Sequence, residues 1–117
     1  MTKPNPQRLT AQAHERIRQI HQAVAELETL CTGTLFKSLM KCGKPTCRCH
    51  QDPAARHGPY YQWGHMKAGK LVRRYVSPAQ AVLLRQAITN YRTLKKLIRA
   101  WEAQTERLID AQAPTKS

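Results

Sequence analysis

Four side chains that can bind a metal ion lie within nine residues, in the stretch CGKPTCRCH. They are Cys42, Cys47, Cys49 and His50. Zinc prefers thiolate and imidazole ligands, and a structural zinc site takes four of them in a tetrahedron. The C-x4-C-x-C spacing differs from the commoner C-x2-C, but the density of ligands indicates a metal site. We therefore predict a structural Zn2+ ion; a redox-active dithiol and cysteines without any ligand are the alternatives.

The fourth ligand has two candidates. His50 follows Cys49 directly and is held beside it by the backbone, whereas His57 lies eight residues beyond Cys49 and is freer to turn toward an ion. Cys31 falls on the apolar seam of a predicted helix, where a buried thiol acts as a small hydrophobic side chain. A site filled by four protein ligands leaves no position for water, so we expect it to be structural rather than catalytic.

The segment around these ligands is strongly basic. Residues 33–76 contain nine basic side chains and a single acidic one, Asp52, which gives a net charge of +8. Lysine and arginine bind phosphates with release of counterions, and an antiparallel ribbon can enter the major groove. Gln62 and Arg73 suit contacts with base edges or phosphates. The predicted nucleic-acid contacts are Lys37, Lys41, Lys44, Arg48, Arg56, Gln62, Lys67, Lys70, Arg73 and Arg74, with Arg85, Arg92 and Lys96 of the second predicted helix.

The same segment offers little material for catalysis. Its single carboxylate excludes the paired acids of two-metal nucleases and of general acid–base chemistry. No P-loop and no G-x-S-x-G sequence occurs. Tyr60 or Tyr61 as a nucleophile would lack the usual catalytic neighbours. We expect the protein not to be an enzyme.

Two long helices are predicted to flank the basic segment. Residues 6–31 carry apolar side chains at spacings of three and four, with Asn5 as N-cap. Residues 78–111 repeat that pattern, and Ser77 with Gln80 forms a capping box. A flexible tail is predicted over residues 112–117. The two seams consist of Ala13, Ile17, Ile20, Val24, Leu27 and Cys31, and of Leu84, Ile88, Tyr91, Leu94, Ile98, Trp101, Thr105 and Leu108.

Between the helices the pattern changes to that of strands. Residues 59–66 and 71–76 are rich in aromatic and branched side chains, and residues 33–41 also have strand character. Ala68 and Gly69 can form a two-residue turn between the second and third strands. This register predicts one face made by Tyr61, Trp63, His65, Val72, Arg74 and Val76, and another made by Gln62, Gly64, Met66, Leu71, Arg73 and Tyr75.

We therefore predict an α+β fold in a single domain of residues 1–117. An antiparallel, coiled-coil-like hairpin of two long helices would carry a small, zinc-stapled antiparallel β head over residues 33–76. With 41% hydrophobic residues in 117 the core is small, and a lone helix pair buries one stripe on each helix. The outer helix surfaces are predicted to form a homodimer.

Three stretches carry a resemblance to a known family: CGKPTCRCH, HGPYYQW and AGKLVRRYVSPAQ. They resemble a family of small, uncharacterised bacterial proteins whose pattern is C-G-K-P-x-C-x-C, then H-G-P-Y, a G-K turn and a basic strand leading into S/T-P-x-Q/E. The resemblance extends from about residue 33 to residue 91. It implies His57 as the fourth ligand, beside Cys42, Cys47 and Cys49. Family members often lie near recombinases or transposases of mobile elements, which implies an accessory role in recombination.

The overall charge also points to a polyanionic partner. Twenty basic residues against seven acidic ones give a net charge of +13. The N-terminus shows no secretory signal and no apolar run is long enough to cross a membrane, so we expect a cytoplasmic, nucleoid-associated protein without a membrane partner. We predict a non-catalytic accessory protein that binds duplex DNA through its head and dimerises, or recruits a recombinase or transposase, through its helices. A protein–protein adapter that uses the helical hairpin and an RNA-binding module are the alternatives.

Overall fold

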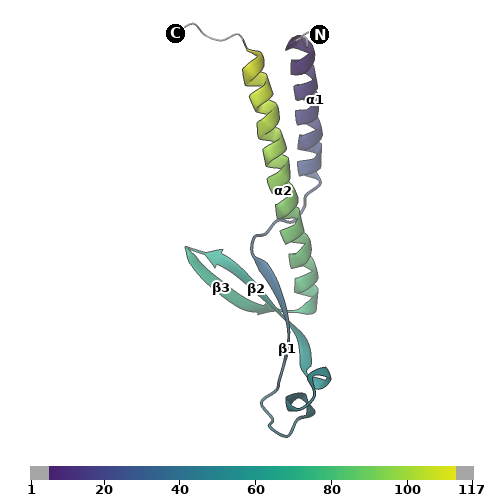
Figure 1. The fold of residues 1–117 in the computed structure, drawn as a ribbon, viewed down its shortest axis with the longest axis vertical. Helices are drawn as coiled ribbons and strands as arrows, with labels where there is room; N and C mark the ends of the chain where they lie inside the picture. The colour runs from purple at the N-terminus through teal and green to yellow at the C-terminus, as the bar shows by residue number, and fades with distance from the viewer. Residues whose placement is uncertain (1–5, 113–117) are drawn as a thin grey trace. The chain divides into compact units, whose positions relative to one another are not determined.

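The computed structural model describes residues 6–112, with two helices and a three-stranded antiparallel sheet. The α+β fold class predicted from the sequence is confirmed (Figure 1). The elements in chain order are α1 (Pro6–Ala25), β1 (Thr34–Met40), the 3-10 turns η1 (Arg48–His50) and η2 (Pro53–Ala55), β2 (His57–Lys67), β3 (Lys70–Val76) and α2 (Pro78–Ala111).

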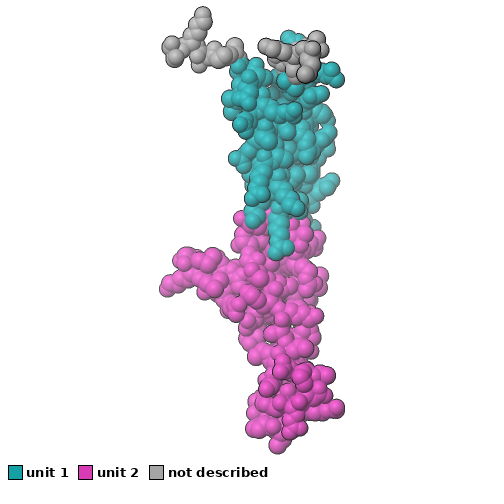
Figure 2. All heavy atoms as spheres, in the orientation of Figure 1, with its two compact units in different colours: residues 1–28, 92–117 teal, residues 29–91 magenta. Residues whose placement is uncertain are grey.

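The chain divides into two compact units, coloured separately in Figure 2. The helical unit comprises residues 1–28 and 92–117, and the head unit comprises residues 29–91. Helix α2 therefore contributes its first part to the head unit and its second part to the helical unit. Two predictions lie outside the described residues: the N-cap at Asn5 and the flexible tail over residues 113–117. Gln112, the first residue of the predicted tail, is described.

In the helical unit, α1 and residues 92–111 of α2 lie side by side and run in opposite directions (Figure 1). Ala13 and Ile20 on the predicted seam of α1 are completely buried, at 0% exposure. The ring of His21 packs edge-on against Trp101 of α2, with 4.6 Å between ring centroids. The apolar spacing on α1 thus identified the side that packs, because residues three and four apart share one face of a helix.

Helix α1 ends at Ala25, not at residue 31 as predicted. Its last turn closes with two i→i+3 hydrogen bonds, in which the N–H groups of Glu26 and Leu27 donate to the carbonyls of Ala23 and Val24. The backbone after this turn forms hydrogen bonds with α2 instead. The N–H of Cys31 donates to the carbonyl of Ala87 at 3.3 Å, and the carbonyl of Thr29 accepts from Nδ2 of Asn90 at 2.8 Å. These bonds to α2 replace helical ones, so Cys31 lies beyond α1 and not on its seam.

Helix α2 starts with the capping box that the sequence indicates. The backbone N–H of Ser77 donates to Oε1 of Gln80 at 2.8 Å, and the N–H of Gln80 donates to Oγ of Ser77 at 3.1 Å. Two N–H groups that have no partner inside the helix are satisfied in this way. In the part of the chain that the structure describes, neither helix holds a stretch apolar and long enough to cross a bilayer.

The sheet has the order β1-β2-β3 and the predicted register between its last two strands. Trp63 pairs with Arg74, and Gln62 pairs with Tyr75. Ala68 and Gly69 form the turn, with φ of 50° and 78°. Positive φ at both central residues is the two-residue hairpin geometry whose twist matches that of the strands.

The two faces of the sheet differ in exposure. On one face Trp63 is half-buried, and with Arg74 it borders a groove of about 310 Å³ that Leu84 and Ala87 of α2 also line. The other face is largely exposed, and we name it the open face. It consists of Phe36, Tyr60, Gln62, Gly64, Met66, Leu71, Arg73 and Tyr75.

Candidate metal centre and basic surface

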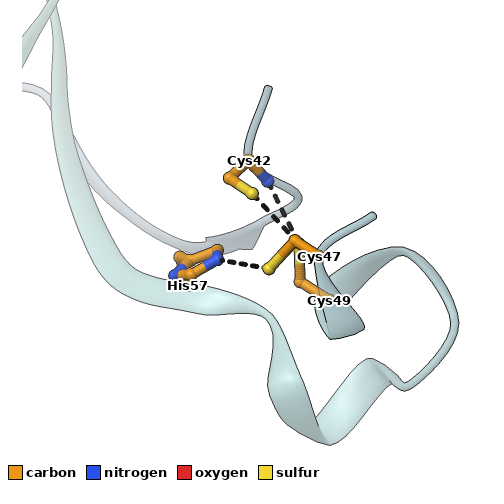
Figure 3. Close-up of side chains that lie close together, drawn as sticks. All are labelled: Cys42, Cys47, Cys49 and His57. Atoms are coloured by element: carbon orange, nitrogen blue, oxygen red, sulfur yellow. Dashed lines mark hydrogen bonds between the residues drawn. The ribbon is translucent and has the colours of Figure 1, made fainter. Parts of the chain in front are cut away.

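Four side chains from three separate pieces of chain meet in the head unit. Cys42 follows β1, Cys47 and Cys49 lie on either side of Arg48 at η1, and His57 is the first residue of β2. Figure 3 shows their ligating groups turned toward one another. All four ligand atoms lie within 4.8 Å of one another. The predicted set is therefore close enough to bind one metal ion.

The separations inside this cluster are short. The sulfurs of Cys42 and Cys49 are 3.6 Å apart, and the sulfur of Cys47 is 3.3 Å from Nε2 of His57. The backbone N–H of Cys42 also points at the sulfur of Cys49, at 3.3 Å. Such N–H groups stabilise a thiolate, which is the form that binds metal.

The environments of two of the thiols differ. The pKa of Cys47 is lowered to about 6. The main cause is the backbone N–H of Cys49, which donates to the Cys47 sulfur, and the second cause is a hydrogen bond from the imidazole of His57. Burial raises the pKa of Cys49, whose side chain is only 1% exposed, although the backbone N–H of Cys42 opposes this effect. Of these two thiols, Cys47 is therefore the one more readily available as thiolate at neutral pH.

A bulge in β2 brings His57 to the cysteines. Ser38 pairs with Tyr60 and Met40 pairs with His57, so β2 has one residue more than β1 over this interval. Gly58 lies in the bulge with φ of 124°, where a side chain would be strained, and a Cβ there would lie 3.0 Å from the carbonyl oxygen of Ser38. Bulges commonly redirect a side chain beside a site, and here the redirected side chain is a candidate ligand.

His50, the other candidate for the fourth ligand, is not part of the cluster. Its Nε2 lies 2.8 Å from the carbonyl oxygen of Cys42, which can only accept a hydrogen bond, so Nε2 carries the proton. His50 instead holds the backbone of Cys42, a candidate ligand.

A scan against protein families matches residues 10–86, which are 77 of the chain's 117 residues, to a family described as a domain of unknown function, DUF6788. The chain belongs to this family. The match contains all four clustered residues and the whole sheet, and it begins within α1, earlier than the resemblance noted in the sequence. Comparisons with curated proteins and with solved structures find no match.

The basic residues predicted to contact nucleic acid are distributed over several surfaces, most of them within the DUF6788 match and Arg92 and Lys96 beyond its end. On the open face, the guanidinium of Arg73 lies 4.0 Å from the centre of the Phe36 ring. Gly64 makes room for this pair, because a Cβ there would lie 2.9 Å from the Phe36 ring. Arg74 lies on the opposite face, with its guanidinium 5.1 Å from the centre of the Trp63 ring.

Further basic side chains lie at both ends of β2. Lys67 and Lys70 pair directly across the hairpin tip. Lys41, Lys44, Arg48 and Arg56 lie in the segment between β1 and β2 that carries the cysteines, and Lys37 lies in β1. Arg48 is 3.7 Å from Asp52 and its side chain is 83% exposed. Arg85 belongs to the head unit, whereas Arg92 and Lys96 belong to the helical unit.

Two features of the site were not predicted from the sequence. Phe36 joins Arg73 on the open face, which depends on the pairing of β1 with β2. Gly58 creates the bulge that directs His57. The alternation of β1 and the Gly-Pro pair after His57 are the sequence signals that could have indicated them.

Proposed function

We propose that the head unit is a zinc-stabilised, non-catalytic module that binds nucleic acid, with duplex DNA as its main ligand. The observation that carries this proposal is the charge of the head. Nine basic side chains are accompanied by one acid over residues 33–76. That acid, Asp52, accepts a hydrogen bond from the backbone N–H of Ala54 and lies beside Arg48, so it is already engaged within the head.

Zinc is the ion that we propose for the cluster. Ligands at about 2.3 Å for sulfur and about 2.0 Å for nitrogen, in a tetrahedron, lie roughly 3.5–3.8 Å apart. Two separations, 3.6 Å between the sulfurs of Cys42 and Cys49 and 3.3 Å between the sulfur of Cys47 and Nε2 of His57, agree with this spacing to a few tenths of an ångström. All four atoms lie within 4.8 Å of one another, so the widest pair could close by up to about 1 Å around the ion. A set of three cysteines and one histidine is also a common structural zinc site.

The proposed role of zinc is to hold residues 41–56 together. In this described segment Cys49 is the only buried side chain. A segment without a hydrophobic core of its own is stabilised by a metal in many small domains, where binding energy becomes folding energy. The ion would thus fix the basic side chains of this segment next to the start of β2.

The shape of the hairpin supports duplex DNA as the ligand. The pairing of β1 with β2 ends at Gly64, so the last three residue pairs of β2 and β3 form a two-stranded ribbon that projects beyond β1 (Figure 1). Lys67 and Lys70 lie at its tip, and Arg73 and Arg74 extend from its two faces nearer the base. Two-stranded ribbons of this kind can enter the major groove.

The open face favours a second candidate, binding of single-stranded DNA or RNA. Phe36, Tyr60 and Tyr75 are 37%, 42% and 61% exposed on this face. Exposed aromatic rings on a sheet, with cations nearby, stack on unpaired bases. This surface would not be needed for contacts with the backbone of a duplex.

Fluorescence anisotropy tests both candidates with labelled duplex DNA, single-stranded DNA and RNA of mixed sequence across a salt series. Tight duplex binding that weakens steeply with salt and survives RNA competition would support the main proposal. Preference for single strands, lost in a Phe36→Leu/Tyr75→Leu variant that keeps every charge, would favour the second. Absence of binding to all three near physiological salt would reject both and favour a protein adapter.

We further propose that the protein assists a recombinase or transposase at its DNA site. This part of the proposal is supported by the sequence resemblance alone. Association with DNA would also place the protein on the nucleoid. Co-purification with DNA from cells, abolished by removal of the basic tip, would support both statements.

A further inference from the structure

The helical unit has an apolar groove on the side of α2 that α1 does not cover. The groove has a volume of about 480 Å³ and is lined by Ile98, Trp101, Glu102, Thr105, Glu106 and Ile109. Ile98 is 42% exposed, Trp101 38% and Ile109 65%. Ile98 and Trp101 belong to the seam predicted for α2, yet α1 packs beside it and leaves this stripe open. An exposed apolar stripe on a helix indicates a docking surface.

A ridge of charged side chains borders this groove. It consists of Arg92, Lys95, Arg99, Glu102, Glu106 and Asp110, and all six are exposed. Their spacings of three or four residues keep them along one side of the helix. The N-terminal half of the ridge is entirely basic and the C-terminal half is entirely acidic. Within the described residues 6–112, none of its three acids forms an ion pair.

The ridge of one copy is complementary in charge to the ridge of a second copy when the two α2 helices run antiparallel. A two-fold axis across α2 near Trp101 would reverse the second helix and set each ridge against its own copy. Arg92 would then face Asp110, Lys95 would face Glu106, and Arg99 would face Glu102. A parallel two-fold arrangement would place the two ridges on opposite sides of the contact, where they could not pair. An isologous two-fold contact requires this kind of self-complementarity.

We propose that α2 pairs with α2 of a second copy of this chain, antiparallel, through the groove and the charged ridge. The apolar side chains supply most of the attraction, because exposed ion pairs contribute little to affinity. The ridge fixes direction and register, because a parallel partner loses these pairs and an antiparallel partner shifted by one turn meets like charges at the centre. Trp101 lies next to the axis, where its ring is held by His21 and where it meets its own copy.

This surface defines which helix faces meet in the homodimer predicted from the sequence, and it sets the two α2 helices antiparallel. It also assigns Arg92 to the dimer and removes it from the nucleic-acid contacts. The inference does not depend on nucleic-acid binding by the head, since all of its residues lie in the helical unit. Either proposal can therefore fail without the other.

Light scattering coupled to gel filtration and analytical ultracentrifugation test the pairing with two charge-reversal variants. The first, Glu102→Lys/Glu106→Lys, makes the ridge basic except at Asp110, and the second, Lys95→Glu/Arg99→Glu, makes it acidic except at Arg92. We expect the unmodified chain to have twice the chain mass of 13.4 kDa, and each variant alone to be monomeric. An equimolar mixture should recover the dimer, because a basic ridge then faces an acidic one.

The mixture distinguishes a lost interface from a lost fold, since misfolded chains would not recover a dimer. The control Glu26→Lys/Glu28→Lys makes the same charge change elsewhere in the helical unit and should stay dimeric. A monomeric unmodified chain at high micromolar concentration would overturn the proposal. So would variants that stay dimeric alone, or a mixture that stays monomeric.

Discussion

Replacement of the two hairpin-tip lysines, Lys67→Gln with Lys70→Gln, should change folding and nucleic-acid binding in opposite directions. The two side chains face each other directly across β2 and β3, and like charges in that position repel. An anionic ligand would relieve this repulsion. The two lysines repel each other in the free protein and would both attract an anion in a complex. Such a pair is expected on a surface that serves binding rather than folding stability.

The register sets the size of both effects. A like-charge pair directly across two strands destabilises the fold by roughly 0.2–1 kcal/mol. The free energy of unfolding of the double variant should therefore rise by about that amount. Each phosphate contact contributes about 0.9 to the slope of log affinity against log salt, so the loss of two contacts should reduce that slope by about 1.8.

The assay combines urea unfolding with anisotropy on a mixed-sequence duplex over a salt series. Arg8→Gln/Arg16→Gln serves as the control, because it also removes two charges from exposed positions, but in the helical unit. The control should leave the salt slope unchanged. An equal loss of slope in the two variants would mean that only total charge matters. An unchanged slope in the tip variant would refute the placement of the tip against phosphates.

Four other variants or conditions test the site and the fold. Cys49→Ser should reduce bound metal from about one ion per chain to near zero by elemental analysis, because a four-ligand site loses its buried thiolate. In metal-free protein, alkylation of Cys47 should be fast at pH 7 and fall to half near pH 6, because acid protonates a thiolate whose pKa is about 6. Ser77→Ala should cost about 1 kcal/mol by loss of the α2 cap, a fall in Tm of roughly 4–8 °C. Ala68→Asn should stabilise by about 0.5–1 kcal/mol, because Asn adopts positive φ more readily than Ala.

Each of these tests has a matched comparison. Cys31→Ser removes the one cysteine outside the cluster and should keep its metal. Cys49, whose pKa is raised by burial, should be alkylated more slowly than Cys47 at pH 7, and the reverse order would contradict the cluster geometry. Thr93→Ala, at an exposed position well inside α2 and outside the groove, should cost less than Ser77→Ala. A loss of stability in Ala68→Asn would contradict the turn conformation.

Much of the architecture could be predicted because local rules decide it. The start of α2 follows from hydrogen bonds between Ser77 and Gln80, which are three residues apart. The register of β2 and β3 follows from a two-residue turn, since a fixed turn fixes every pair beyond it. The end of α1 was predicted wrongly because it depends on Ala87 and Asn90, far along the chain, which bond the segment after Ala25.

The sequence by itself determined the chemistry that is available. It contains three clustered thiols, a histidine beyond them and a basic segment with one acid, and these types and charges do not depend on the fold. Only the tertiary structure decided which groups meet. The bulge at Gly58 brought His57 rather than His50 to the sulfurs, the strand order put Phe36 under Arg73, and the packing of α1 left Ile98 and Ile109 open. These contacts and exposures depend on residues that are far apart in the sequence, so a local sequence pattern cannot predict them.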